Sequence, residues 1–287
     1  MDSLSLARLH GGMTTTATDT TLVLGATGKT GRRVAERLSA LDVPVRAGSR
    51  AAEVPFDWED RATWAPVLDG ARAVYVTYQP DLAVPGAPEA VGELARLAVA
   101  AGVERLVLLS GRGEEEAQRA EEAVRAVFPA ATIVRASWFA QNFSENFLAD
   151  AVRAGVVALP VGDVGEPFVD ADDIADVAVA ALTEPGHAGR LYEVTGPRLL
   201  TFAQALEEIG RAGGPAARLE RIPVEAFRAE LEQVVTPPEA ALVTYLFAEV
   251  LDGRNASVAR GVQEALGRPP RDFADYARDA AAAGAWG

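Results

Sequence analysis

The 287-residue chain has no cysteine, only two histidines and a single lysine. Without cysteine it can form no disulfide, no thiolate nucleophile and no cysteine-based metal site. His10 falls in a loose N-terminal segment and His187 in a Pro-Gly loop, so we expect neither to act as a general base. Because Lys29 is the only lysine, a mechanism that uses a catalytic lysine on the later helices is excluded.

Long apolar runs are also missing. No segment is apolar for long enough to cross a bilayer, and residues 1–20 lack the apolar core of a signal peptide. We therefore expect a cytoplasmic protein with no membrane partner. The Thr- and Gly-rich residues 1–20 are expected to be disordered, and Met13 within them is a second candidate for the true start.

Basic residues are in the minority, since 27 Lys and Arg stand against 41 Asp and Glu, which gives a net charge of −14. This balance argues against a nucleic-acid partner, because neutralising phosphates requires clustered Lys and Arg. The length allows one large α/β domain, with or without a smaller appendage.

The most informative segment is 21–41. A β-branched, apolar run leads directly into Gly25, Gly28 and Gly31, and an amphipathic helix follows. Glycines let the backbone turn tightly, and the free N–H groups of the first helical turn face an anion, so this pattern predicts a dinucleotide diphosphate site. An ordinary glycine-rich turn is the alternative. The residues expected to bind the cofactor here are Gly25, Thr27, Gly28, Lys29, Thr30 and Gly31.

Predicted strands and helices alternate over most of the chain. Strands are expected at 22–24, 43–47, 54–56, 73–77, 106–109, 132–134 and 191–194, with helices at 61–68, 88–101 and 114–127 between them. Alternation of this kind predicts an α/β fold with a doubly wound parallel sheet of the Rossmann type. We assign 21–217 to a NAD(P)-binding domain and 218–287 to a small, mainly helical cap, with its clearest helices at 237–250 and 257–266.

In such sheets the ligand lies beyond the carboxyl ends of the strands. Besides the glycine loop, that rule points to Gly48–Arg50, Thr77–Pro80, Ser110–Arg112 and Ala136–Phe139, and it adds Thr77, Tyr78, Ser110 and Ala136 to the expected site.

The second strand should indicate which dinucleotide binds. An acidic residue at its end would bind the ribose hydroxyl of NAD, but no acid occurs there before Glu53. Arg50 can grip a phosphate and Ser49 can add a hydroxyl donor, so we favour NADP(H) over NAD(H); a solvated loop cation is the alternative for Arg50. Asp57 is expected either to contact the adenine or to cap a strand end.

A common proton donor for hydride chemistry is absent. Short-chain dehydrogenases usually supply it from a Tyr-x-x-x-Lys pair, but the five tyrosines are followed four positions later by Gln79, Leu82, Gly196, Glu249 and Ala280. What remains is an acceptor that needs little acid help, an acid of another kind, or no catalysis.

Four segments resemble the NmrA-like, atypical short-chain dehydrogenases: Gly25–Gly31 (GATGKTG), Leu106–Ser110, the Thr132–Asn142 segment with its WFAQNF stretch, and Phe168–Ala175. Within that group the chain is most similar to the festuclavine and agroclavine dehydrogenases and their bacterial relatives, as Gly48–Arg50 and Phe56–Trp58 also indicate. The likeness runs from about Thr21 to the Arg268–Phe273 segment.

The resemblance implies NADPH-dependent reduction of a C=N⁺ bond, and that chemistry suits the missing pair because the product is a neutral amine. A quinone or an enone would also tolerate a weak acid. By the same resemblance Ser110 and Tyr78 lie at the nicotinamide and are the candidate catalytic residues, although Tyr78 suits packing better. Trp138 and Phe139 would form an apolar substrate wall, or simply core, and Asn142 would supply an amide.

Other polar clusters are expected to be structural. Asp170, Asp172 and Asp173 fit a helix cap better than a metal site. The acids of Glu114–Glu116, with Glu121 and Glu122, are expected to form a solvated helix face. In the cap, Tyr245 and Phe247 could line the pocket, but helical core is the safer interpretation.

Two functions stay open. One is a reductase of a small-molecule imine, quinone or enone; the other is a non-catalytic NAD(P) sensor that alters its affinity for a protein partner. Either could be a monomer or a homodimer.

Overall fold

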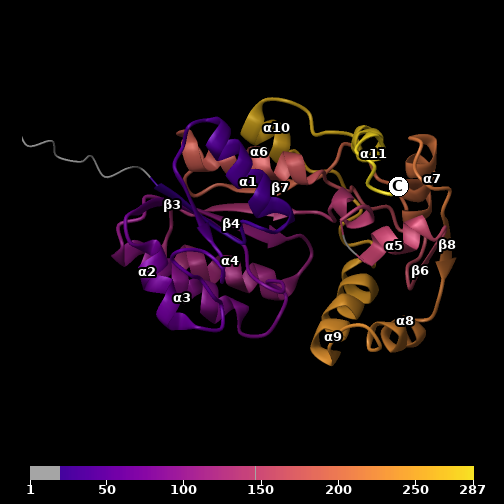
Figure 1. Ribbon diagram of the computed structural model, residues 1–287, viewed down its shortest axis with the longest axis horizontal. Coiled ribbons are helices and arrows are strands. Elements are labelled where there is room, and N and C mark those ends of the chain that lie inside the picture. Colours follow the sequence, from indigo (N-terminus) through magenta and orange to yellow (C-terminus); the bar gives the residue numbers. More distant parts are fainter. Residues whose placement is uncertain (1–19, 146) are drawn as a thin grey trace, which may run out of the picture.

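The computed structural model describes residues 20–145 and 147–287 and contains a six-stranded parallel sheet (Figure 1). Its strand order is β2-β1-β3-β4-β5-β7. The strands are β1 (Thr20–Leu24), β2 (Val45–Gly48), β3 (Ala71–Val76), β4 (Arg105–Gly111), β5 (Thr132–Ala136) and β7 (Leu191–Val194). Since the chain leaves β1 for β2 on one side and returns to β3 on the other, the sheet confirms the predicted doubly wound, Rossmann-type fold.

Helices cover both faces of this sheet (Figure 1). One face carries α2 (Trp64–Leu68), α3 (Ala87–Ala100) and α4 (Glu115–Val127), and the other carries α1 (Lys29–Ala40), α6 (Ala171–Thr183) and α10 (Gly261–Leu266). Each face has its own apolar core, and the central strands are buried on both sides, as their continuous apolar runs require.

A second core lies beyond the carboxyl ends of the strands. It is built on the parallel pair β6 (Val156–Leu159) and β8 (Arg218–Arg221), with α5 (Phe147–Arg153), α7 (Phe202–Arg211), α8 (Val224–Leu231), α9 (Pro237–Tyr245) and α11 (Phe273–Ala282) around it. Because this core joins Phe143 and Leu148 to Phe202 and Phe273, it crosses the division predicted at residue 217. That division stays a prediction.

One sequence-based assignment is wrong. Residues Val54–Phe56 form no strand; Phe56 instead packs edge-on against Trp58 at 4.9 Å, in an aromatic cluster with Trp64. The segment after residue 217 is mainly helical, as predicted, but it begins with the strand β8, whose charged residues Arg218, Glu220 and Arg221 gave no apolar pattern.

The predicted cap helices are present but shorter. The 237–250 segment is α9 followed by a π-helical turn, Leu246–Val250, and α10 starts only at Gly261. Among the described residues, no helix is both long and apolar enough to span a membrane. The predicted disorder of the N-terminal tail, the candidate start Met13 and His10 concern residues 1–19, which lie outside the described residues; Thr20 already belongs to β1.

Candidate cofactor and substrate site

The glycine loop has the geometry that a diphosphate requires. Gly25 adopts φ +68°, and a Cβ at Gly31 would lie 2.2 Å from the Gly25 carbonyl oxygen, so both positions demand glycine. Helix α1 starts at Lys29 behind Gly28, which has no side chain to cap the free N–H groups of the first turn. These residues therefore fit an anionic ligand at the start of α1.

The residues expected at the adenosine end lie apart from this loop. Arg50 is exposed just after β2, and no acidic partner for it is found in residues 20–145 or 147–287. The Ser49 carbonyl oxygen accepts the Phe56 amide at 3.0 Å, which folds the following segment back. Asp57 sits in a turn, where its Oδ1 accepts the Glu59 amide at 3.1 Å, so it caps a turn and not a strand.

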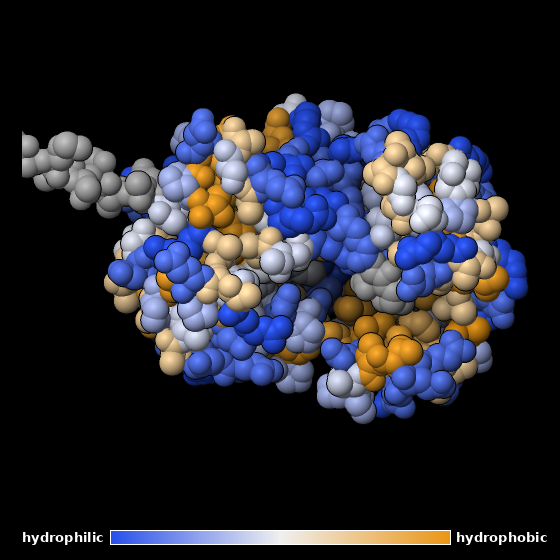
Figure 2. All heavy atoms as spheres, viewed as in Figure 1, coloured by the Kyte–Doolittle hydropathy of each residue, from blue (hydrophilic) through white to orange (hydrophobic). Residues whose placement is uncertain are grey.

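A cavity of about 530 Å³ opens at the carboxyl ends of β3, β4 and β5, between the sheet and α9. Figure 2 shows the molecule hollowed there, with hydrophobic side chains gathered on the α8–α9 side. Of the predicted site residues the cavity brings together Lys29, Thr77, Tyr78, Ser110, Ala136, Trp138, Phe139 and Asn142. It does not include Gly25, Thr27, Gly28, Thr30, Gly31, Ser49, Arg50 or Asp57.

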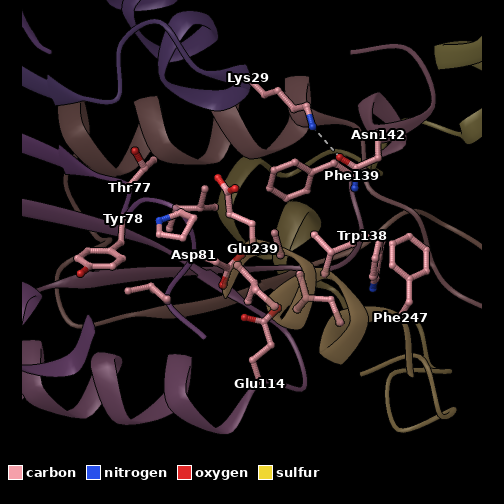
Figure 3. A pocket seen from close by; sticks show the side chains of 18 of the residues that line it. Lys29, Thr77, Tyr78, Asp81, Glu114, Trp138, Phe139, Asn142, Glu239 and Phe247 are labelled. Atoms are coloured by element: carbon pink, nitrogen blue, oxygen red, sulfur yellow. Dashed lines mark hydrogen bonds between the residues drawn. The ribbon is translucent and has the colours of Figure 1, made fainter. Parts of the chain in front are cut away.

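Trp138 is both cavity wall and core. Its ring packs against Phe247 at 4.6 Å and against Phe202 at 6.0 Å (Figure 3). Phe247 is likewise buried in the second core and also lines the cavity. For both residues, the predicted role in the pocket and the predicted role in the core are therefore compatible. Tyr245 is not among the lining residues.

The single lysine joins the glycine loop to the substrate wall. Lys29 Nζ donates a hydrogen bond to Asn142 Oδ1 at 2.7 Å (Figure 3). Burial lowers the pKa of Lys29 to about 8, against the opposing effect of the Glu145 carboxylate. The group is therefore a partly buried cation with a neutral hydrogen-bond partner, which a bound anion would stabilise.

Tyr78 is held by an aromatic neighbour. Its ring lies 4.7 Å from Trp58, whose Nε1 donates to the Thr77 carbonyl oxygen at 3.1 Å. Burial and the nearby Glu59 raise the pKa of Tyr78, which makes it a poorer acid. The structure thus favours packing over proton donation for this residue.

The Ser110 hydroxyl is already engaged. It donates to Glu121 Oε1 at 2.6 Å, and Arg135 binds the same carboxylate with contacts of 2.9 and 2.5 Å. Glu121 is 3% exposed, so the expectation that it belongs to a solvated face is wrong. The helical periodicity of α4 could have indicated this burial, because Glu121 falls on the buried side of the helix beside Ala117 and Val124.

Three acidic residues of the cavity were missed. Asp81 follows β3, Glu239 lies in the first turn of α9, and Glu114 precedes α4. Glu114 is 8% exposed, whereas it too was expected in solvent. The nearby Glu115 and Glu122 are exposed, as predicted. The available signal was position: Glu114 is the first acid after the end of β4, where ligands bind in such sheets.

The remaining polar clusters are structural. Asp170 caps α6 by accepting the Asp172 amide at 2.9 Å, which confirms the predicted cap. Its neighbours form ion pairs: Asp172 with Arg37 at 2.8 Å and Asp173 with Arg268 at 2.7 Å. His187, expected to lack partners, is buried with Nδ1 2.9 Å from the Tyr192 hydroxyl, and it does not line the cavity.

Known proteins share this architecture. A protein family described as NAD(P)H-binding matches residues 25–185. The (4-alkanoyl-5-oxo-2,5-dihydrofuran-3-yl)methyl phosphate reductase of Streptomyces griseus is 36% identical, covering 91% of this chain and 98% of its own. Agroclavine dehydrogenase of Claviceps fusiformis is 30% identical, covering 91% and 96%. An Escherichia coli NADPH-dependent quinone oxidoreductase solved with NADPH superposes with a TM-score of 0.75 at 20% identity, over 91% and 99% of the two chains.

Proposed function

Because the chain belongs to the NAD(P)H-binding family, we propose that it is an NADPH-dependent reductase of a small organic acceptor: an imine or iminium, a quinone or an enone. The observation that carries the proposal is the cavity of about 530 Å³ at the strand ends, which reaches from Lys29 to Trp138. Bound NADPH supplies the hydride; the chain supplies binding, orientation and exclusion of water.

Each part of the site has a task in this proposal. The backbone of the Gly25–Gly31 loop binds the diphosphate, with Lys29 beside it. Ser110 and the turn after Ala136 flank the nicotinamide. Trp138, Phe139 and Phe247 bind the acceptor through apolar contact, while Asn142 orients it.

The acceptor classes follow from what the site lacks. A simple carbonyl becomes an alkoxide that needs a strong, positioned donor, and no Tyr-x-x-x-Lys pair exists in the sequence. Hydride addition to a conjugated acceptor spreads the negative charge over several atoms, and hydride addition to an iminium cation gives a neutral amine. The names of two relatives support this choice, since one describes a ring double bond conjugated with carbonyl groups and the other a clavine alkaloid.

Arg50 is proposed to set the preference for NADPH. Replacing Arg50 with Ala should weaken NADPH binding about 10- to 100-fold, as expected when a charge-assisted contact to phosphate is lost, and should leave NADH binding unchanged. The matched control is Arg119→Ala, which removes an exposed arginine from α4. Titration calorimetry with both cofactors measures the effect. Tighter binding of NADH by the wild type would contradict the preference.

Turnover decides between the two predicted functions. We expect NADPH consumption, followed by absorbance, with at least one acceptor from a panel of menadione, cyclohexenone and an N-methyl-dihydroisoquinolinium salt. Tight NADPH binding without consumption for any of them would instead support the sensor.

A further inference from the structure

The cavity contains a pair of acids without a counter-ion. Asp81 and Glu114 both line it, and Glu114 Oε2 is buried with no hydrogen-bond partner in the described part of the chain. Neither carboxyl group forms an ion pair with any arginine or lysine of residues 20–145 and 147–287. Asp81 is partly buried, and its Oδ1 accepts the Ala83 amide at 2.8 Å. Glu114 is buried, and a buried carboxylate is normally paired or coordinated, so its position requires a different explanation.

The loop after β4 is shaped around the Glu114 carboxyl group. A Cβ at Gly111 would lie 2.2 Å from Glu114 Oε1, so the group rests directly on the bare backbone of that residue. Gly113 adopts φ +80°, and a Cβ there would meet the Asn255 side chain at 2.5 Å. These glycines let the chain turn at the end of β4 and bring Glu114 into the cavity, toward Asp81 (Figure 3).

The surroundings of the two acids favour the retention of one proton. Burial and the adjacent Asp81 raise the pKa of Glu114 well above its ordinary range, and burial raises the pKa of Asp81 as well. Two neighbouring carboxylates in a poorly solvated site cannot both ionise, and the protonated one can donate a hydrogen bond to the other.

We propose that Glu114, oriented by Asp81, is the proton donor in the reduction of a neutral conjugated acceptor. This proposal rests on the reductase function above and concerns its neutral acceptors, the quinones and enones. The electrophilic carbon of the acceptor receives hydride, with both electrons, from the reduced cofactor, and the π electrons move to the conjugated oxygen. That oxygen takes the proton as the O–H bond of Glu114 breaks. Glu114 is left as a carboxylate and regains a proton from water.

Other charged groups surround Glu114 and bear on its titration. They are Glu115 and Glu121 of α4, Tyr245 of α9, Arg254, which donates to the Gly113 carbonyl oxygen at 3.2 Å, and Arg112. The two arginines are neutralised elsewhere, Arg254 by Asp252 and Arg112 by Glu193. Most of the remaining neighbours are acids, which disfavour the loss of the proton.

The first test observes the proton without any turnover. Infrared difference spectroscopy of the NADPH complex at pH 7 should show a protonated-carboxyl band that shifts in deuterium oxide. Part of this band should disappear in Glu114→Gln and none of it in Glu115→Gln, which makes the same change at the exposed neighbouring position. The part that remains belongs to Glu166, whose pKa burial raises to about 7 and which does not line the cavity. A Glu114→Gln spectrum identical to that of the wild type overturns the proposal.

The second test compares acceptors. With menadione or cyclohexenone, Glu114→Gln should lower kcat about 10²- to 10³-fold, the usual contribution of a positioned acid. With the N-methyl-dihydroisoquinolinium salt, whose product needs no proton, kcat should be unchanged. Equal effects on both classes overturn the proposal. If the wild type binds NADPH but reduces nothing, the reductase function fails, and the infrared band still decides where the proton lies.

Asp81 is tested as the positioning residue. Asp81→Asn removes the neighbouring negative charge, so the pH at which kcat/KM for menadione declines should move downward. Circular dichroism checks that this variant folds. A uniform loss of activity with an unmoved pH profile would leave Asp81 no such role.

Discussion

Helix α4 carries one buried glutamate and is preceded by another, and their surroundings are opposite. Glu121 is 3% exposed and bonds to Ser110 and Arg135. Glu114 is 8% exposed, lies beside another acid and has an oxygen without a donor in the described residues. Glu121 lies within α4, whereas Glu114 is the N-cap residue that precedes its first turn. The comparison teaches that burial alone does not assign a role to a carboxylate; its partner does.

The largest effect should come from removing the partner of Glu121. Arg135→Met leaves that carboxylate buried without its cation and should lower the free energy of unfolding by about 3 kcal/mol. Arg119→Met breaks the exposed contact with Glu116 and should cost less than about 1 kcal/mol. Urea denaturation measures both. Equal losses would mean that the buried pair contributes no more than a surface pair.

Neutralising Glu121 should have a smaller effect. Glu121→Gln keeps the shape but weakens charge-assisted bonds from Ser110 and Arg135, so unfolding should become easier by about 2 kcal/mol. The same denaturation experiment measures it. If Glu121→Gln were more stable than the wild type, the ionised Glu121 carboxylate would not stabilise the fold, and the two glutamates would not differ in this respect.

Neutralising Glu114 should act in the opposite direction. Its folded pKa is raised above the unfolded value, so wild-type stability is lost as the pH rises from about 4 toward the folded pKa. Glu114→Gln cannot suffer this loss, and at pH 7 it should be more stable than wild type by about 1 kcal/mol. The gap should close below pH 4. Thermal unfolding across that range, with Glu115→Gln as control, measures it; a constant gap would contradict the titration.

Displacing Glu114 without changing its charge should alter stability least among the folded-state variants. In Gly111→Ala the new Cβ meets only the movable end of the Glu114 side chain, so stability should change by no more than about 0.5 kcal/mol. Menadione reduction should nevertheless fall toward the rate of Glu114→Gln. Steady-state rates measure this effect. An unchanged rate would show that menadione reduction does not depend on the position of the Glu114 carboxyl group.

Lys29 extends the comparison of the two glutamates to a partly buried cation. Because its pKa is about 8, NADPH affinity should be constant below that pH and decline above it as the amine loses its charge. Lys29→Arg stays charged and should abolish the decline. Calorimetric Kd values from pH 6 to 9.5 provide the measurement, and a decline that survives in Lys29→Arg would assign it to another group.

Much of the fold was predictable because its signals are local. The apolar run before Gly25 and the periodic segment after Gly31 are contiguous in the sequence, and the structure places a strand and a helix there. The predicted likeness to NmrA-like proteins and clavine dehydrogenases, and the prediction of an NAD(P)H-dependent reductase, are confirmed by the family match and by the relatives.

The failures concern long-range arrangement. Nothing near Arg218 reveals that it pairs with Val156, 62 positions earlier in the chain. Likewise the periodicity of α4 does not extend to its N-cap residue Glu114, and it cannot show that this residue enters a cavity lined by α9 and by the loop after β3. Asp81 was overlooked for the same reason: its importance depends on which group faces it, and no local pattern encodes that.

The single lysine also gives the protein a site for selective chemical labelling. Apart from the α-amino group, Lys29 carries the only primary amine of the chain, and its pKa of about 8 leaves more of it unprotonated at neutral pH than is usual for a lysine. An acylating reagent would consequently label Lys29 of the glycine loop and the α-amino group. The increment at Lys29, blocked by saturating coenzyme, would then report occupancy directly.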